Sequence, residues 1–190
     1  MKKLSLVIAL AVWGFTANAQ TPTAVKFPAV DASPLDIAYY PANAAKVKKD
    51  DTSMPIIKVL YSRPAKKGRE VFGVLEQFDK VWRFGANEST EIYFAKAVTV
   101  GNTKLKPGTY SLFAIPSKDK WTIIVNKQTD RWGAFTYDQT KDLARIEVPI
   151  TRLEKPIEAF SIVFTEAAQG ANMVMAWDTT QAMLPITFKK

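Results

Sequence analysis

Alternation of apolar and polar residues with a period of two runs along much of the chain and limits its fold more than any other feature. Successive side chains of a β-strand point to opposite faces, so each alternating run predicts a strand with one buried face. The apolar positions of the clearest runs are Ile57, Val59 and Tyr61; Ile146, Val148 and Ile150; Phe160, Ile162 and Phe164; Met173, Met175 and Trp177; and Ala182, Leu184, Ile186 and Phe188.

Three further segments, residues 90–100, 108–115 and 121–126, are rich in aromatic and β-branched residues, which are typical of strands. Turn-forming pairs such as Gly101-Asn102 and Pro107-Gly108 separate them. The sequence therefore predicts an all-β fold, a single-domain antiparallel β-sandwich of jelly-roll-like form with about 8–10 strands.

One segment departs from this pattern and predicts a short helix. Its apolar residues are spaced as on one face of a helix rather than at every second position. They are Val74, Leu75, Phe78, Val81 and Trp82.

The first 19 residues have the composition of a secretory signal peptide. Lys2 and Lys3 precede an apolar run over residues 4–15, and the segment ends in Ala17-Asn18-Ala19. The apolar run is shorter than the roughly 20 residues that span a bilayer, so we expect no membrane span.

This organisation predicts cleavage near Ala19-Gln20 and export to the periplasm or the surrounding medium. Because residue 20 is Gln rather than Cys, no lipoprotein anchor can form there. Residues 20–34 are rich in Pro, Ala and Thr and predict an extended leader. Residues 35–190 then form the β-sandwich domain.

The composition excludes several kinds of chemistry, because the chain contains neither Cys nor His. Disulfides, thiolate nucleophiles, His-dependent triads and Cys/His metal sites are therefore impossible. The sequence also lacks the spacing of a calcium loop or a phosphate-binding Gly loop, so we expect no metal and no cofactor. The formal net charge is +8, but its cations are scattered, which favours solvated loops over a nucleic-acid site.

The most unusual segment, residues 81–90, brings an indole, a guanidinium, a carboxamide and a carboxylate together around Gly85. Arg presents a planar fork to anions, Asn and Glu bind hydroxyl groups, and Trp offers a flat apolar face to a ring. A second arginine lies at a predicted strand end, where the two guanidinium groups could converge into an anion pocket. The predicted ligand-binding residues are Arg63, Trp82, Arg83, Asn87 and Glu88.

Ordinary structural roles are the alternative for these residues. Trp82 can belong to the core, Asn87 can close a turn, and the arginines can pair with carboxylates at the surface. In the same way, Trp121, Trp132 and Tyr137 either line a stacking platform or belong to an aromatic core.

An enzymatic role would have to use carboxylates. General acid/base catalysis of glycoside hydrolysis needs two carboxyl groups that flank a bond, and Glu88 with Asp178 or Glu76 is the candidate pair by residue type. We therefore expect no catalytic residue unless the protein is an enzyme, in which case Glu88 is the acid or base.

A series of short motifs occurs in order over roughly residues 33–188. They are Tyr61-Ser62-Arg63-Pro64, Lys67-Gly68-Arg69, Phe72-Gly73, Val81-Trp82-Arg83, Gly85-Ala86-Asn87-Glu88, Gly108-Thr109-Tyr110-Ser111-Leu112 and Trp132-Gly133. Together they resemble the domain of unknown function 2911 family of exported bacterial proteins. The resemblance implies an exported, mostly β protein and supplies no catalytic residues. Phe78-Asp79 stands where relatives tend to have Tyr-Gly, which removes a glycine expected to form a tight turn.

Three classes of function follow. The first is a binding module for a small polar or anionic ligand, or a glycan fragment, at the five residues named above. The second is a structural or protein-interaction domain of the cell envelope, and the third is a carboxylate-dependent hydrolase. The binding module requires the Arg63 and Arg83 side chains to open into one cleft beside Trp82. The sequence leaves the oligomeric state open.

Overall fold

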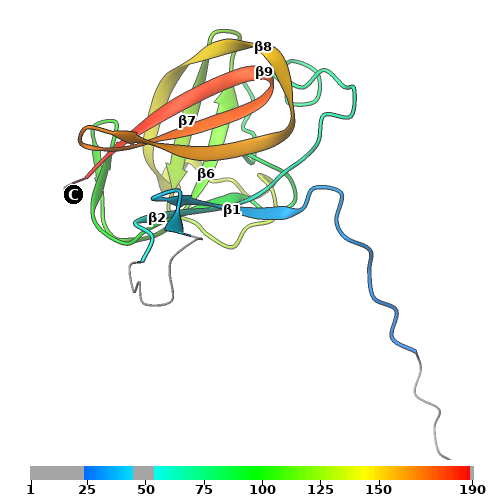
Figure 1. Ribbon diagram of the computed structural model, residues 1–190, viewed down its shortest axis with the longest axis horizontal. Helices are drawn as coiled ribbons and strands as arrows, with labels where there is room; N and C mark the ends of the chain where they lie inside the picture. The colour runs from blue at the N-terminus through cyan, green and yellow to red at the C-terminus, as the bar shows by residue number, and fades with distance from the viewer. Residues whose placement is uncertain (1–23, 45–53, 189–190) are drawn as a thin grey trace, which may run out of the picture.

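The computed structural model describes residues 24–44 and 54–188. Within them, nine strands form one open antiparallel sheet in the order β1-β2-β3-β6-β7-β8-β9-β4-β5 (Figure 1). The all-β prediction is confirmed, and the number of strands lies within the expected range. The strands are β1 (Leu35–Tyr40), β2 (Ile57–Ser62), β3 (Thr90–Phe94), β4 (Val98–Val100), β5 (Thr103–Leu105), β6 (Gly108–Pro116), β7 (Lys120–Asn126), β8 (Asp142–Ala167) and β9 (Gly170–Thr187).

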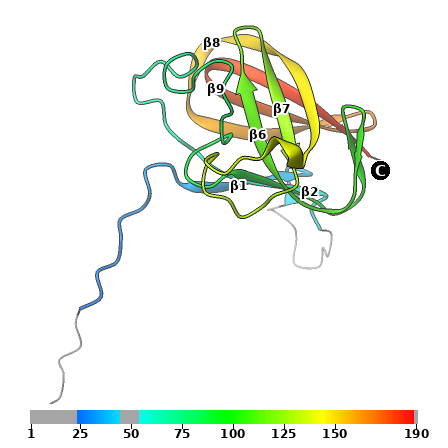
Figure 2. The same cartoon turned by 180° about the vertical axis from the view of Figure 1, so that it is seen from behind.

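The two long strands, β8 and β9, make the sheet curl over itself. β8 pairs with β7 through residues 142–149 and with β9 through residues 150–167, with register shifts between Arg152 and Ser161. The turn between β8 and β9 lies against the far end of β9. There the Phe188 amide donates to the Gln169 carbonyl oxygen at 2.9 Å. Figures 1 and 2 show the long strands wrapping over β6 and β7. The layers expected of a sandwich are therefore two parts of one bent sheet.

The segment after β2 ties that side of the sheet to β8. The Lys66 amide donates to the Glu158 carbonyl oxygen at 2.8 Å, and the Phe160 amide donates to the Pro64 carbonyl oxygen at 2.9 Å. Ala65 and Ala159 form an isolated antiparallel bridge between these bonds. As a result, β2 ends against β8 although the two strands are not neighbours in the sheet.

An aromatic cluster fills the space that the bent sheet encloses. Each member is at most 8% exposed, and burial of a large apolar side chain contributes about 1.5–3 kcal/mol. Trp82 and Trp177 stack with ring centroids 5.9 Å apart. The cluster consists of Phe72, Trp82, Phe84, Trp121, Phe160 and Trp177.

The prediction of a short helix over residues 74–82 is wrong. The segment forms turns, and Trp82 instead pairs with Ala114 of β6 through two backbone hydrogen bonds of 2.7 and 3.0 Å. The expected apolar face does not exist, because Val74 is 63% exposed while Trp82 is buried. Tertiary pairing with β6 thus overrides the local spacing. The three-residue 3-10 helix η2 (Gln139–Lys141) precedes β8.

The predicted signal peptide, residues 1–19, lies outside the described residues. Residues 24–34 contain no strand or helix and lead away from the sheet in Figure 1, and nearly all of them are exposed. In the part of the chain that the structure describes, no helix is long and apolar enough to cross a membrane.

Candidate functional site

The loop between β7 and β8 folds back onto the start of β3 and builds the site. The Ser89 amide donates to the Arg131 carbonyl oxygen at 2.9 Å, and Glu88 and Trp132 form an isolated antiparallel bridge. The Asp130 amide donates to Oε1 of Glu91 at 2.7 Å. These contacts fix the backbone of the loop beside the outer face of β3.

A polar cluster at the base of the loop fixes its other end. Nδ2 of the buried Asn126 donates to Oδ1 of Asp142 at 2.8 Å, and the Tyr137 hydroxyl donates to Oδ2 of Asp142 at 2.6 Å. Arg145 Nη1 donates to the same Asp142 oxygen at 2.8 Å. Burial and the hydrogen bond to Asp142 raise the pKa of Tyr137 to about 12, so its hydroxyl remains a donor at neutral pH. Tyr137 is therefore a structural residue of the loop.

A hollow of about 350 Å³, called here the Trp132 hollow, lies where this loop meets the outer face of β1, β2 and β3. Its apolar wall includes Trp132, which is 60% exposed, with Leu35 and Leu60. The polar part of its lining includes three carboxylates and two buried serines. They are Glu88, Glu91, Asp130, Ser62 and Ser89, and Arg131 also lines the hollow.

Strand alternation places these side chains on the outer face. In β2, Val59 and Tyr61 are buried in the core, while Leu60 between them is 37% exposed. Glu91 lies directly opposite Leu60 on β3, so it shares that face. The period-two pattern of the sequence therefore positions the floor of the site as well as the core.

A second hollow of about 260 Å³ adjoins the first on the same face. It is lined by Leu60 and Glu91, which the two hollows share, and by Ile37, Lys58, Tyr93 and Thr109. The Lys58 ammonium lies 4.9 Å from the centroid of the Tyr93 ring.

Arg63 does not line the first hollow. Its guanidinium joins β1 to β8: Nη1 lies 2.9 Å from Oδ2 of Asp36, and Nη2 donates to the Ser161 hydroxyl at 2.9 Å. Nε donates to the Phe160 carbonyl oxygen at 3.2 Å. All three guanidinium nitrogens of Arg63 therefore already donate to protein groups.

Trp82 cannot stack on a ligand that enters from solvent, because it is 3% exposed within the aromatic cluster. Its Nε1 donates to the Gly85 carbonyl oxygen at 3.1 Å. The core interpretation of this tryptophan is the one that the structure supports.

Arg83 and Asn87 lie together, apart from the contacts of Arg63. Arg83 Nη1 donates to the Asn87 carbonyl oxygen at 3.2 Å, and its guanidinium carbon lies 5.5 Å from the centroid of the Phe135 ring. Asn87 has a φ of 56°, and its Nδ2 donates to Oδ1 of Asp31 at 3.0 Å. That bond, with a larger contribution from the Ser33 amide, lowers the pKa of Asp31. Both residues thus stabilise the turn that leads into β3.

Of the five predicted ligand-binding residues, Glu88 alone lines the Trp132 hollow. The neighbouring carboxylates were not identified from the sequence: Glu91 follows Glu88 by three residues on β3, and Asp130 reaches it from a loop 39 residues beyond Glu91. Among the residues described, no group of three or more acidic side chains lies close enough to hold a metal ion.

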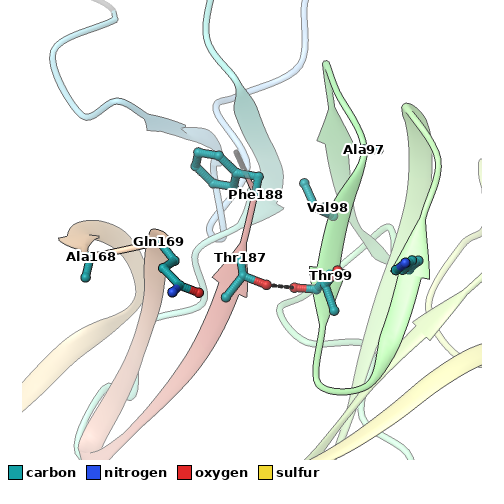
Figure 3. Close-up of a pocket in the computed structure, with 8 residues that line it drawn as sticks. Ala97, Val98, Thr99, Ala168, Gln169, Thr187 and Phe188 are labelled. Carbon is teal, nitrogen blue, oxygen red and sulfur yellow. Dashed lines mark hydrogen bonds between the residues drawn. The ribbon is translucent and has the colours of Figure 1, made fainter. Parts of the chain in front are cut away.

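A larger hollow of about 680 Å³ lies between the β4–β5 hairpin and the end of β9. Figure 3 shows it lined mainly by small side chains, with the Thr187 hydroxyl donating to the Thr99 carbonyl oxygen at 3.4 Å. It has neither a carboxylate nor an exposed aromatic ring, and its longest polar side chains are Lys104 and Gln169.

Comparison with protein families gives one finding. The model of the family described as "Protein of unknown function (DUF2911)" matches residues 41–186. No curated protein and no solved structure matches the chain.

Proposed function

The chain belongs to the DUF2911 family, and we propose that it is an exported binding module whose Trp132 hollow takes a polar, hydroxyl-rich ligand such as a glycan fragment. The observation that carries the proposal is the exposed Trp132 ring beside the carboxylates of Glu88, Glu91 and Asp130. An indole stacks on the apolar face of a sugar ring, and carboxylates accept hydrogen bonds from its hydroxyl groups.

The Glu88 carboxylate supports this role because no other protein group among the described residues occupies it. It is exposed, and within residues 24–44 and 54–188 it makes no hydrogen bond or ion pair. Oε1 of Glu91 accepts from the loop, which fixes that side chain at the hollow. A ligand would thus meet one positioned and one available carboxylate.

The same charges disfavour an anionic ligand in this hollow. Three carboxylates face one cation, Arg131, whereas the two arginines expected to bind an anion are held by protein groups elsewhere. We therefore propose a neutral hydroxylated ligand rather than a phosphate or a sulfate.

Thermal unfolding of the purified protein with single sugars and anions tests this proposal. Glucose, galactose, mannose, N-acetylglucosamine and their disaccharides should include a ligand that raises the unfolding midpoint, and sulfate and phosphate should not. A ligand present at about 100 times its Kd stabilises a protein by about 2.7 kcal/mol.

Matched variants locate the site in the same experiment. Trp132→Ala should abolish the shift, and Glu88→Gln should reduce it. Phe135→Ala is the control, because Phe135 is 79% exposed on the same loop but does not line the hollow. A sugar-induced shift that survives Trp132→Ala, or a panel in which anions alone stabilise the protein, would contradict the proposal.

A carboxylate-dependent hydrolase is the second candidate, favoured by the three carboxylates that line one hollow. The pair would be Glu88 with Glu91 or Asp130, not the Asp178 or Glu76 suggested by residue type. Asp178 is engaged by Lys66, with Nζ 2.6 Å from Oδ1. Release of reducing ends from a bound oligosaccharide, lost in Glu88→Gln, would favour hydrolysis over binding alone.

Export is the part of the proposal that rests on residues 1–19. Their basic start, apolar run and Ala17-Asn18-Ala19 ending support it. Expression in a bacterial host with N-terminal sequencing tests it: the proposal requires a mature protein that begins at Gln20 in the periplasm or medium.

A further inference from the structure

We infer that the ligand is a linear oligosaccharide that runs across both hollows of the outer face, from Trp132 to Tyr93. The inference rests on the proposed function and adds the length and shape of the ligand. The two hollows share Leu60 and Glu91, which are direct cross-strand partners on β2 and β3. They therefore adjoin along β2 and β3, and the two together are called here the outer groove.

The two ends of the outer groove carry exposed aromatic rings. Trp132 lies opposite Glu88 in its bridge, and Tyr93 stands five positions further along the same segment of chain. At a strand rise of about 3.3 Å per residue, these positions are roughly 16 Å apart. A single sugar ring cannot contact both ends, whereas a short linear chain can.

The middle of the outer groove suits the same ligand. Leu60 provides an apolar surface, and Glu91 beside it provides carboxylate oxygens. A sugar ring carries hydroxyl donors at its rim and has apolar C–H faces, so one sugar unit can contact Leu60 and Glu91 together. Tyr93 is 36% exposed with the Lys58 ammonium 4.9 Å from its ring centroid, and its hydroxyl can donate or accept at the far end.

Other polymers fit this face less well. A peptide that extends a sheet binds at a strand edge, whereas the outer groove lies on the face of β1, β2 and β3 rather than at the outer edge of β1. A nucleic acid needs cations along its phosphates, whereas the three carboxylates of Glu88, Glu91 and Asp130 outnumber the two cations of the groove, Arg131 and Lys58.

Calorimetric titration with oligomers of defined length tests the inference on the purified protein. The probes are β-1,4-linked glucose and β-1,4-linked N-acetylglucosamine, each from one to six units. For at least one series we expect the tetramer to bind about tenfold more tightly than the monomer, as a second stacked ring contributes. We expect little further gain from four to six units.

The variants separate the two ends of the outer groove. Tyr93→Ala should weaken tetramer binding about tenfold and leave the monomer within about twofold, whereas Tyr93→Phe, which keeps the ring, should retain most of the length dependence. Trp132→Ala should weaken every length. Circular dichroism and urea unfolding of each variant establish that it is folded.

The outcomes distinguish this inference from the proposed function. Equal affinity for monomer and hexamer, unchanged by Tyr93→Ala, would overturn the extended ligand while binding at Trp132 stands. Binding of trilysine, but of no oligomer in either series, would overturn the oligosaccharide and identify a cationic ligand. If sugars of every length fail to bind, both proposals are wrong.

Discussion

Nη1 of Arg63 lies 2.9 Å from Oδ2 of Asp36, so an arginine that resembled a ligand-binding group instead joins the first strand of the sheet to the end of the second. The other guanidinium nitrogens reach Phe160 and Ser161 on β8. One side chain therefore ties together three parts of the bent sheet that are distant in sequence.

Replacing Arg63 should lower stability more than removing an ordinary surface cation. Arg63→Ala removes three hydrogen bonds, but the pair with Asp36 is more than one third exposed, so we expect a loss of about 1–2 kcal/mol. Lys120→Ala is the control, since its pair with Glu147 is more exposed and should contribute less than the contacts of Arg63. Urea unfolding measures both, and equal losses would contradict the role given to Arg63.

Truncation of Trp82 should lower stability, whereas truncation of Trp132 should remove ligand binding. Trp82→Ala leaves a cavity in the aromatic cluster and should cost about 3–5 kcal/mol of unfolding free energy. Trp132→Ala removes a ring that is 60% exposed and should change stability by less than about 1 kcal/mol while it abolishes ligand binding. Denaturation and titration of the same samples check both halves. A comparable loss of stability in the two variants would place Trp132 in the core.

The strands could be predicted from the sequence because each buried face leaves a period of two. The alternation at Ile57, Val59 and Tyr61 marks β2, and all three residues are buried as expected. The bending of the sheet could not be predicted, since it depends on which partner each half of β8 meets. The false helix arose because local spacing does not record that Trp82 pairs with β6.

The candidate site was harder to predict for the same reason. Glu88 was identified by its type, but Trp132 and Asp130 come from a distant loop, which is held by the Glu88–Trp132 bridge and by the hydrogen bond from the Asp130 amide to Glu91. Trp82 and Trp132 are chemically alike, and only packing determines which ring is exposed. The sequence offered both as alternatives without the contacts that separate them.

Gly170 should be far less tolerant of a side chain than Gly108. A Cβ at Gly170 would overlap the Ile186 carbonyl oxygen and lie 3.0 Å from the Thr187 Cα, so the end of β9 would have to move. Gly170→Ala should therefore cost about 3 kcal/mol. Gly108 has a φ of 145° with nothing within 4 Å of such a Cβ, so Gly108→Ala should cost about 1–2 kcal/mol from the backbone alone. Thermal unfolding compares them, and a reversed order would contradict this packing of β9.

Glu76 should make the protein less stable as the pH rises through the weakly acidic range. Burial raises its pKa from 4.5 to about 7, against the opposing effects of Arg83 and Arg69. Between these values the folded state keeps a proton that the unfolded state releases, so the free energy of unfolding falls as pH rises, by up to about 3 kcal/mol. Glu76→Gln should remove this fall and stabilise the protein at pH 8 but not at pH 4. Urea unfolding at both values measures it, with Glu166→Gln, an exposed position at the end of β8, as the control. A Glu76→Gln variant whose stability follows that of the parent protein over the whole range would show that the carboxyl group is solvated.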